Sequence, residues 1–445
     1  MKTAILGAGI SGFGAARLAK KLGYDLFLSD KGMIPENQQQ ILNDLGIEWE
    51  HGTHTIDKIF DADFVVKSPG IPDQIPLITA LHDSNIPVIS EIEFASRHTD
   101  ATLIAITGSN GKTTTTSLTY ELLKNAGFNV GLGGNIGQSF AGQVATNDFE
   151  YYVLEISSFQ LDGIVDFAPH ISILTNITPD HLDRYNYDFD LYAHAKMRIR
   201  ENQTENDHFI YCGDDAAILA SLEKYAIKSQ LYAFGLEENN KYAAQKIENH
   251  LHFFIKSRTF KFLIDALSLQ GPHNQLNMMV TTLVGMLLNI ESDTIYKTFC
   301  NFENLEHRME KVATLQDVIY INDSKATNVI SVQYALETVT QPIIWIVGGV
   351  DKGNDYNVLL PLVRQKVKHI VALGKDNQKI LKAFDSVSLP IVEAKSMKDA
   401  VVAAQKAANA GDCVLLSPAC SSFDLFKNYE DRGRQFKEMV LALKS

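Results

Sequence analysis

The chain has 445 residues, of which 45% are hydrophobic and 21% charged, a composition that is typical of a folded globular protein and excludes a disordered one. Its formal charge is −13, from 40 basic and 53 acidic residues, and no block of Lys and Arg stands out, so we expect no nucleic-acid partner. Its four cysteines form no CxxC pair, which favours free thiols in a reducing compartment.

The N-terminal stretch MKTAILGAGISGFG predicts a strand and a glycine turn rather than a signal peptide. The longest apolar run, near residues 278–290, is too short to span a bilayer. We therefore expect a soluble, cytoplasmic protein without a membrane span, and we expect a monomer.

Three stretches of the chain share one order: an apolar strand, a glycine-rich turn and a helical pattern. The turns are GAGISG, GSNGKTTTT and GGVDKG. Such units predict parallel sheets flanked by helices, with ligands at the carboxyl ends of the strands. The expected fold class is α/β with three domains. These are a Rossmann-like domain at 1–97, a central P-loop-type ATPase domain with a mainly parallel sheet at 98–295, and a Rossmann-like domain at 296–445.

The individual elements follow from the apolar patterns in chain order. Strands are expected at 3–6, 25–29, 64–67, 88–90, 102–107, 151–156, 171–176, 318–322, 343–347, 369–373 and 413–417. Helices are expected at 15–22, 191–200 and 275–288. The short alternating runs between 208 and 264 predict a small antiparallel addition.

The most specific motif is ITGSNGKTT at 106–114. Gly108 and Gly111 stand closer together than in the standard phosphate loop, yet they still allow consecutive backbone N–H groups to face one anion. A helix beginning near Thr113 adds its positive end. Lys112 is placed to reach the terminal phosphates, and the Thr113 hydroxyl to join a magnesium shell. A plain strand-to-helix turn needs neither side chain. We therefore predict a nucleotide site made of Gly108, Ser109, Asn110, Gly111, Lys112, Thr113 and Thr114.

The first glycine run, Gly7-x-Gly9-x-x-Gly12 with Asp30 after the second strand, has three interpretations. It resembles a dinucleotide fingerprint, which is the basis of an alternative hypothesis, an NAD-dependent oxidoreductase. It also suits another diphosphate, because backbone N–H groups do not read a nicotinamide. The third interpretation is a turn that only packs a helix on a sheet.

Glu155 and His181 follow two strands of the central domain. With Thr113 they are candidate magnesium ligands, although imidazole is an unusual ligand for that ion and both residues also suit ordinary surface or hydrogen-bonding roles. On spacing alone, Lys196 is interpreted as a solvated helix lysine. Asn274 suits either a helix cap or a reader of an adenine edge.

In the third domain two cations, Lys325 and Lys352, follow strands in an acidic protein, which favours a small anionic substrate. The segment SPACSSFD adds hydroxyls and helix N–H groups for the same anion. Cys420 within it has no histidine nearby in the sequence, which disfavours a nucleophilic role.

Taken together, the stretches GSNGKTTTT, EISSFQLD, NITPDHLDRY, AKMRI, GPHN, EHRME, NDSKATN and SPACSSFDLFKNYEDRG resemble the Mur ligase family in order and cover all three expected domains. The last two point to its D-glutamate-adding branch. The resemblance implies an ATP-dependent ligase of peptidoglycan synthesis that takes UDP-MurNAc-L-Ala and D-glutamate and forms an acyl phosphate. The alternatives are another Mur ligase, a folylpolyglutamate-type synthase, or a nucleotide-gated binding protein without ligase chemistry.

The resemblance also assigns residues. It implies an ATP site that includes Asn274, Arg308 and Asp323 besides the glycine loop. It implies two Mg²⁺ ions held by Thr113, Glu155, His181 and a carbamylated Lys196. Catalysis is expected from Lys112, His181, Lys196, Lys325 and Lys352. D-Glutamate is expected at Lys325, Lys352, Ser422 and Tyr429, the muramoyl-alanine path at Asn135, Ser157 and Ser158, and the uridine diphosphate at Ser11, Asp30, Lys31 and Ser68.

Overall fold

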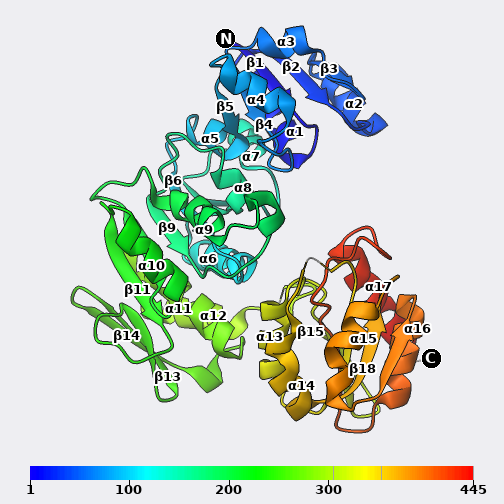
Figure 1. Ribbon diagram of the computed structural model, residues 1–445. Coiled ribbons are helices and arrows are strands. Elements are labelled where there is room, and N and C mark those ends of the chain that lie inside the picture. Colours follow the sequence, from blue (N-terminus) through cyan, green and yellow to red (C-terminus); the bar gives the residue numbers. More distant parts are fainter. Residues whose placement is uncertain (304, 352, 444–445) are drawn as a thin grey trace. The chain divides into compact units, whose positions relative to one another are not determined.

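The computed structural model describes residues 1–303, 305–351 and 353–443 (Figure 1), and they form two compact units. Unit 1 consists of Met1–Leu267 and Asn274–Asn301, and unit 2 of Ser268–His273 and Phe302–Ser445. Unit 1 contains two sheets and unit 2 contains one. The predicted α/β class with mainly parallel sheets is confirmed. Among the helices of the described ranges, none is both long enough and apolar enough to traverse a bilayer.

The first sheet of unit 1 is fully parallel, in the order β3-β2-β1-β4-β5. Its strands are β1 (Lys2–Leu6), β2 (Asp25–Asp30), β3 (Glu48–His51), β4 (Phe64–Lys67) and β5 (Val88–Ser90). The flanking helices are α1 (Ile10–Lys21), α2 (Glu36–Asp44), α3 (Ile56–Phe60) and α4 (Pro76–Asp83). The chain order reverses direction on either side of β1, which is where such sheets bind ligands.

The second sheet has nine strands in the order β14-β13-β12-β11-β10-β9-β6-β8-β7. They are β6 (Thr102–Thr107), β7 (Val130–Gly134), β8 (Tyr151–Glu155), β9 (Ile171–Leu174), β10 (His208–Cys212), β11 (Gln230–Gly235), β12 (Ala244–Ile247), β13 (His250–Ile255) and β14 (Arg258–Leu263). The expectation of an antiparallel addition over 208–264 is wrong for its first half. Both β10 and β11 continue the parallel sheet, because helix α10 (Ala216–Lys224) connects them as a crossover. Only β12, β13 and β14 pair antiparallel.

The remaining helices of unit 1 are α5 (Glu91–Ser96), α6 (Lys112–Asn125), α7 (Phe140–Thr146), α8 (Ser158–Leu161), α9 (Phe189–Met197), α11 (Pro272–Leu287) and α12 (Ser292–Asn301). Helix α11 begins three residues before the predicted start, with proline at its first position, where a missing N–H costs nothing. Asn274 therefore lies inside the first turn, and the interpretation of this residue as a helix cap is wrong.

Unit 2 contains one sheet in the order β15-β16-β20-β17-β18-β19, parallel except for the hairpin β15–β16. Its strands are β15 (Glu310–Leu315), β16 (Val318–Asn322), β17 (Ile343–Val347), β18 (Val367–Leu373), β19 (Ile391–Ala394) and β20 (Cys413–Leu416). Helices α13 (Val329–Thr338), α14 (Leu360–Lys366) and α15 (Gln378–Phe384) pack on one face, α16 (Met397–Ala407) and α17 (Tyr429–Ala442) on the other. All five residues of β17 are buried, as expected for a strand covered on both faces.

Candidate functional site

The predicted phosphate loop connects β6 to α6 and depends on two glycines with positive φ. Gly108 has φ +149° and Gly111, which caps α6, has φ +81°. A Cβ at Gly108 would lie only 1.9 Å from Thr175 Oγ1, so no other residue fits without moving the neighbouring loop. The N–H groups of Ser109 and Asn110 are bonded to Asn176. The N–H groups that suit an anion are those at the start of α6, the positive end of a 14-residue helix.

A second loop, which follows β9, fixes the phosphate loop in place. Asn176 accepts a hydrogen bond from the Asn110 N–H at 2.8 Å, and Thr175 Oγ1 donates to the Asn110 carbonyl at 2.7 Å. Ser109 Oγ lies 2.9 Å from the hydroxyl of Tyr192 on α9. These supporting residues were not predicted individually. Of the three, only Asn176 lies in the motif NITPDHLDRY, and which backbone group each residue holds depends on tertiary packing.

Two lysines meet at the carbonyl oxygen of Gly108. Lys112 Nζ donates to it at 2.6 Å, and Lys196 Nζ on α9 donates to it at 2.8 Å. Lys196 is only 2% exposed, so its interpretation from spacing as a solvated lysine is wrong. Burial, and after it repulsion from Lys112, lowers the pKa of Lys196 far below its ordinary value. Burial therefore favours the neutral amine form of this side chain.

Glu155 ends β8 with its carboxylate buried. One oxygen accepts a hydrogen bond from Asn135 Nδ2 at 2.8 Å. Within the described part of the chain the other oxygen has no hydrogen-bond partner. Burying a carboxylate oxygen without a hydrogen-bond donor is unfavourable unless a cation binds to that oxygen. The second oxygen of Glu155 is therefore suited to bind a metal ion. Glu155 also lies close enough to Lys196 for its charge to affect that amine.

His181 follows β9 and adopts a left-handed conformation with φ +52°. Its ring stands edge-on to Phe159 with centroids 5.2 Å apart, and its Nε2 lies 3.7 Å from an oxygen of Asp180. The ring is 43% exposed and is therefore accessible to a ligand. Asp180, like Glu155, acts electrostatically on Lys196.

The two serines predicted on the muramoyl-alanine path begin α8. Ser157 forms a capping box with Gln160, in which the Ser157 N–H and Oγ both donate to the Gln160 side chain at 2.9 Å. Ser158 is buried. Ser157 therefore caps helix α8. The backbone of this turn follows Glu155 in the sequence.

Helix α11 supports the phosphate loop from the side of Asn274. Asn277, one turn further, donates to Asn274 Oδ1 at 3.2 Å and accepts from Thr115 Oγ1 at 3.0 Å. A Cβ at Gly111 would lie 2.7 Å from Asn277 Oδ1. Asn277 is thus a site-supporting residue that sequence analysis missed, and its only signal was its place one turn after GPHN.

A cavity of about 790 Å³ opens beside the first glycine run. The four residues predicted for the uridine diphosphate line it: Ser11, Asp30, Lys31 and Ser68. The two oxygens of Asp30 accept hydrogen bonds from the N–H groups of Ala8 at 2.5 Å and Gly32 at 2.7 Å. Apolar side chains such as Ile71 and Ile75 complete the wall. The volume and mixed lining are ordinary for a small-molecule site.

In unit 2, Lys325 and Tyr429 come together although 104 positions separate them in the sequence. Lys325 Nζ lies 3.7 Å from the centroid of the Tyr429 ring, a cation–π arrangement. Ser422, seven residues before Tyr429 in the sequence, is buried in the SPACSS segment. Lys352, the other predicted cation, lies outside the described residues.

Two structural features hold the loops of unit 2 that carry these residues. Val350 and Ser421 exchange backbone hydrogen bonds at 2.9 and 3.2 Å, which joins the GGVDKG and SPACSS loops. Arg432 on α17 is 1% exposed, and its guanidinium donates to Ser324 and to the Cys420 carbonyl at 2.8–3.1 Å. Arg432 was not predicted, because the amphipathic pattern of a helix does not show that one of its arginines is buried.

Asp323, predicted as a nucleotide contact, is buried after β16. Burial raises its pKa to about 7. Its oxygens accept hydrogen bonds from Ser417 Oγ at 2.8 Å and from the Met309 N–H at 3.2 Å. The carboxyl group therefore anchors the loop that carries Arg308, whose neighbours His307 and Met309 both have positive φ.

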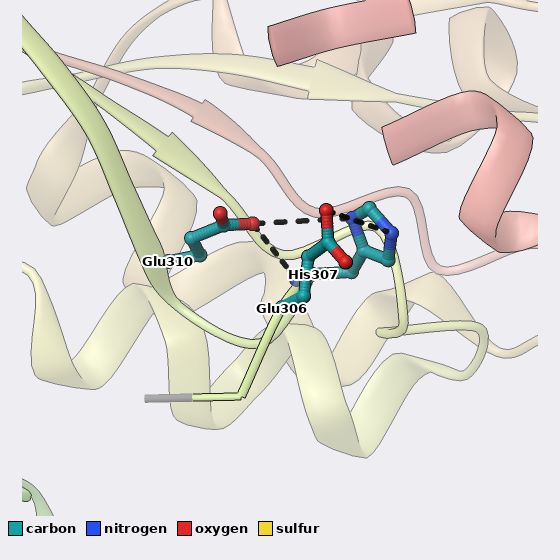
Figure 2. Close-up of side chains that lie close together, drawn as sticks. All are labelled: Glu306, His307 and Glu310. Carbon is teal, nitrogen blue, oxygen red and sulfur yellow. Dashed lines mark hydrogen bonds and ion pairs between the residues drawn. The ribbon is translucent and has the colours of Figure 1, made fainter. Parts of the chain in front are cut away.

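Beside that loop, Glu306, His307 and Glu310 converge (Figure 2), and their ligand-type atoms lie within 4.8 Å of one another. This arrangement does not suit a metal ion. Lys437 already pairs with both carboxylates, at 2.9 and 2.5 Å, and Asn322 Nδ2 donates to His307 Nδ1 at 2.9 Å. The cluster is an ion-pair and hydrogen-bond network that fixes the loop.

Cys420 is buried against the hydroxyl of Tyr356 at 3.1 Å. Burial raises the pKa of its thiol to about 11, so the thiolate is not available at neutral pH. This agrees with the sequence analysis, in which the absence of a nearby histidine disfavours a nucleophilic role for Cys420.

Three family models match the chain: "Mur ligase middle domain" at residues 106–285, "Mur ligase, glutamate ligase domain" at 307–420 and "MurD N-terminal domain" at 2–75. A protein of Christiangramia forsetii named UDP-N-acetylmuramoylalanine–D-glutamate ligase is 53% identical over 99% of both chains. One of Bacteroides fragilis with the same name is 50% identical, again over 99% of both. The chain belongs to the Mur ligase family.

Solved Mur ligase structures agree with this in fold. A pseudomurein peptide ligase type C from Methanothermus fervidus matches with a TM-score of 0.65 at 18% identity over 99% of both chains. The UDP-N-acetylmuramate–alanine ligase of Thermotoga maritima gives 0.61, also at 18%, over 100% of both. As a Mur ligase the chain is a ligase enzyme, and the alternative of an NAD-dependent oxidoreductase is wrong: the first glycine run belongs to a Mur ligase N-terminal domain.

Proposed function

We propose that this Mur ligase adds D-glutamate to UDP-N-acetylmuramoyl-L-alanine with ATP, through an acyl phosphate, in peptidoglycan synthesis, as a cytoplasmic monomer. The observation that carries the choice of amino acid is the full-length similarity to relatives named for this reaction. The geometry of the phosphate loop supports the use of ATP.

The first step joins two anions, because the alanyl carboxylate attacks the γ-phosphate. In the loop of residues 108–114, the N–H groups at the start of α6 and the ammonium of Lys112 would offset the repulsion, because they place positive charge at a preorganised helix N-terminus. Lys112 Nζ, which donates to the carbonyls of Gly108 and Ser109 within the loop, would exchange these bonds for phosphate oxygens. Asn274, Arg308 and Asp323 are proposed around the nucleotide, with Asp323 acting through the loop that carries Arg308.

The residues of unit 1 fit two magnesium ions, for which Thr113, Glu155, His181 and Lys196 would supply ligands. Two features support the fit: the unpartnered buried oxygen of Glu155 and the burial of Lys196, which lowers its pKa and favours the neutral amine. A neutral amine forms an N–C bond to carbon dioxide and releases a proton, which gives a carbamate anion. That anion could ligate a cation where a protonated lysine could not. When bound, magnesium neutralises phosphate charge and orients the oxygens.

In the second step the amine of D-glutamate forms the amide bond to the acyl carbon, and phosphate leaves. We propose that Lys325, Lys352, Ser422 and Tyr429 position D-glutamate, so that its neutral amine attacks the carbonyl carbon. Lys325 and Lys352 would attract the carboxylates. Along the acyl substrate we propose Asn135, Ser157 and Ser158, and for its uridine diphosphate Ser11, Asp30, Lys31 and Ser68.

The decisive experiment is phosphate release from ATP with UDP-MurNAc-L-Ala and a panel of amino acids. We expect release that depends on D-glutamate and on the nucleotide sugar. Preference for another amino acid would place the chain with a different Mur ligase, and release without any amino acid would indicate a plain nucleotidase.

A further inference from the structure

His54 lies on the loop that follows β3, and it lines the cavity beside the first glycine run together with Asp30 and Lys31. The loop is tied to the sheet at its start, where the Gly52 N–H donates to the Asp30 carbonyl at 2.9 Å. The ring is half-buried. None of the motifs assigned to the reaction includes this histidine, so its place in the cavity wall needs an explanation.

Hydrogen-bond accounting fixes the tautomer of the His54 ring. Ser29 Oγ lies 2.6 Å from Glu50 Oε1 and 2.6 Å from His54 Nδ1. Burial favours the protonated acid, but the hydrogen bonds from Ser29 and Thr55 outweigh it and lower the pKa of Glu50, so Glu50 is an acceptor only. The single hydroxyl proton of Ser29 therefore goes to Glu50. The imidazole must then carry a proton on Nδ1 and donate it to Ser29, which selects the tautomer with Nδ1–H.

The consequence is a lone pair on Nε2, the other polar atom of the ring. Among the described residues none makes a hydrogen bond to Nε2 of His54. In the neighbouring Asp30 both carboxylate oxygens already accept backbone N–H groups. Ser29 and Glu50 are directly paired across β2 and β3, so the ring is held by rigid strands rather than by a mobile loop.

We propose that Nε2 of His54 accepts a hydrogen bond from the nucleoside part of the UDP substrate and contributes to its selection. This inference rests on the proposed function, because it takes the cavity as the uridine diphosphate site. A neutral acceptor recognises an N–H or O–H donor, and a uridine nucleoside offers two sources: the N3–H of uracil and the ribose hydroxyls. Cytosine has no proton at N3, so a contact to the base would also reject cytidine nucleotides.

Two amide substitutions of His54 distinguish the roles of its two ring nitrogens. His54→Asn places an amide near Nδ1 and keeps the contact to Ser29 while it removes the acceptor at Nε2. His54→Gln reaches further and returns an amide oxygen near Nε2. We expect His54→Asn to raise the KM for UDP-MurNAc-L-Ala about fivefold, the size of one neutral hydrogen bond. His54→Gln should lie closer to wild type. The KM values for ATP and D-glutamate and the kcat should stay unchanged in both variants.

The matched control is His82→Asn, because His82 is an exposed histidine on helix α4, which flanks the same sheet, and it does not line the cavity. Thermal unfolding of all variants checks that they fold alike. If His54→Asn leaves the KM for UDP-MurNAc-L-Ala at the wild-type value, or if His54→Gln is equally impaired, the acceptor role is wrong. If wild type itself does not use UDP-MurNAc-L-Ala, the proposed function fails independently of His54.

Calorimetry with UDP analogues identifies the donor. The probes are UDP, its 2′-deoxy and 3′-deoxy forms, and UDP methylated at N3 of uracil. We expect one probe to bind wild type about fivefold more weakly than UDP, and this difference to vanish in His54→Asn. Equal losses in wild type and in His54→Asn for every probe would overturn the proposal.

Discussion

Lys196 Nζ donates a hydrogen bond to the carbonyl oxygen of Gly108 at 2.8 Å, inside the phosphate loop. The same carbonyl accepts from Lys112. Two ammonium groups at one oxygen would repel each other, and burial together with this repulsion lowers the pKa of Lys196. This is the relation on which the proposed carbamate at Lys196 depends, because only the neutral amine form of a lysine reacts with carbon dioxide.

The first prediction concerns Lys196→Ala. We expect turnover to fall at least a hundredfold, without recovery at high bicarbonate, because no amine remains to form the carbamate. Carbon-13 NMR with labelled bicarbonate gives a readout that is independent of turnover: wild type should show a carbamate resonance and Lys196→Ala should lack it. An active Lys196→Ala enzyme would remove the carbamate from the mechanism.

The second prediction concerns Lys112→Ala, which removes the only mobile cation of the loop motif. Loss of one preorganised charge-stabilising group reduces rates on the order of a hundredfold to a thousandfold, and we expect kcat to fall by at least that much. Lys124→Ala is the matched control, since Lys124 is an exposed lysine at the far end of the same helix. Comparable activity of the two variants would contradict the assignment of Lys112.

The phosphate loop and the β-strands around it could be predicted because their signals are local. Glycines at fixed spacing, a lysine and a hydroxyl after them, and fully apolar runs such as Ile343–Val347 all lie in short windows. Strand β3 was not predicted, because its sequence, EWEH, has no buried residue and lacks the apolar pattern that indicates a strand. The direction of β10 and β11 was predicted wrongly because their short alternating runs are more typical of antiparallel strands, whereas these two strands pair parallel.

The supports of the site could not be predicted, since each depends on contacts far apart in the sequence. Asn277 reaches Thr115 across 162 positions and Arg432 reaches Ser324 across 108. The burial of Lys196 belongs to the same class: five of the last six residues of α9 are buried, although the helix ends in a run of basic residues. From the sequence, only the resemblance to Mur ligases indicated a role for Lys196 other than that of a solvated helix lysine.

The third prediction concerns the ring of Tyr429, which lies against the ammonium of Lys325. Tyr429→Phe keeps a ring 3.7 Å from the ammonium, whereas Tyr429→Leu removes it. A cation–π contact contributes about 0.5–2 kcal/mol, so we expect Tyr429→Leu to raise the KM for D-glutamate about three- to tenfold. Tyr429→Phe should resemble wild type, and the KM for ATP should not change in either variant. Steady-state kinetics that show equal impairment of both variants would argue against a role for the ring.

The fourth prediction concerns pH and the helix that joins the two sheets of unit 1. Glu91 on α5 accepts hydrogen bonds from Ser139 Oγ at 2.9 Å and from the Ala141 N–H at 2.6 Å, at the start of α7. Burial raises the pKa of Glu91 from 4.5 to about 7. The folded protein therefore binds this proton more tightly than the unfolded chain does. Stability is highest below the unfolded pKa and falls as pH rises through the folded value.

Glu91→Gln tests this relation, because an amide imitates the protonated acid and does not titrate. Between about pH 4.5 and 7 the Glu91 carboxyl should cost wild type up to about 3 kcal/mol of unfolding free energy, and Glu91→Gln should not share this loss. Urea unfolding at pH 5 and pH 8 measures it for wild type, Glu91→Gln and Glu36→Gln, an exposed control on α2. Because Asp323 also has a raised pKa, only the difference between the variants reports on Glu91. Parallel pH dependence in all three proteins would show that the Glu91 carboxyl does not change its charge in this range.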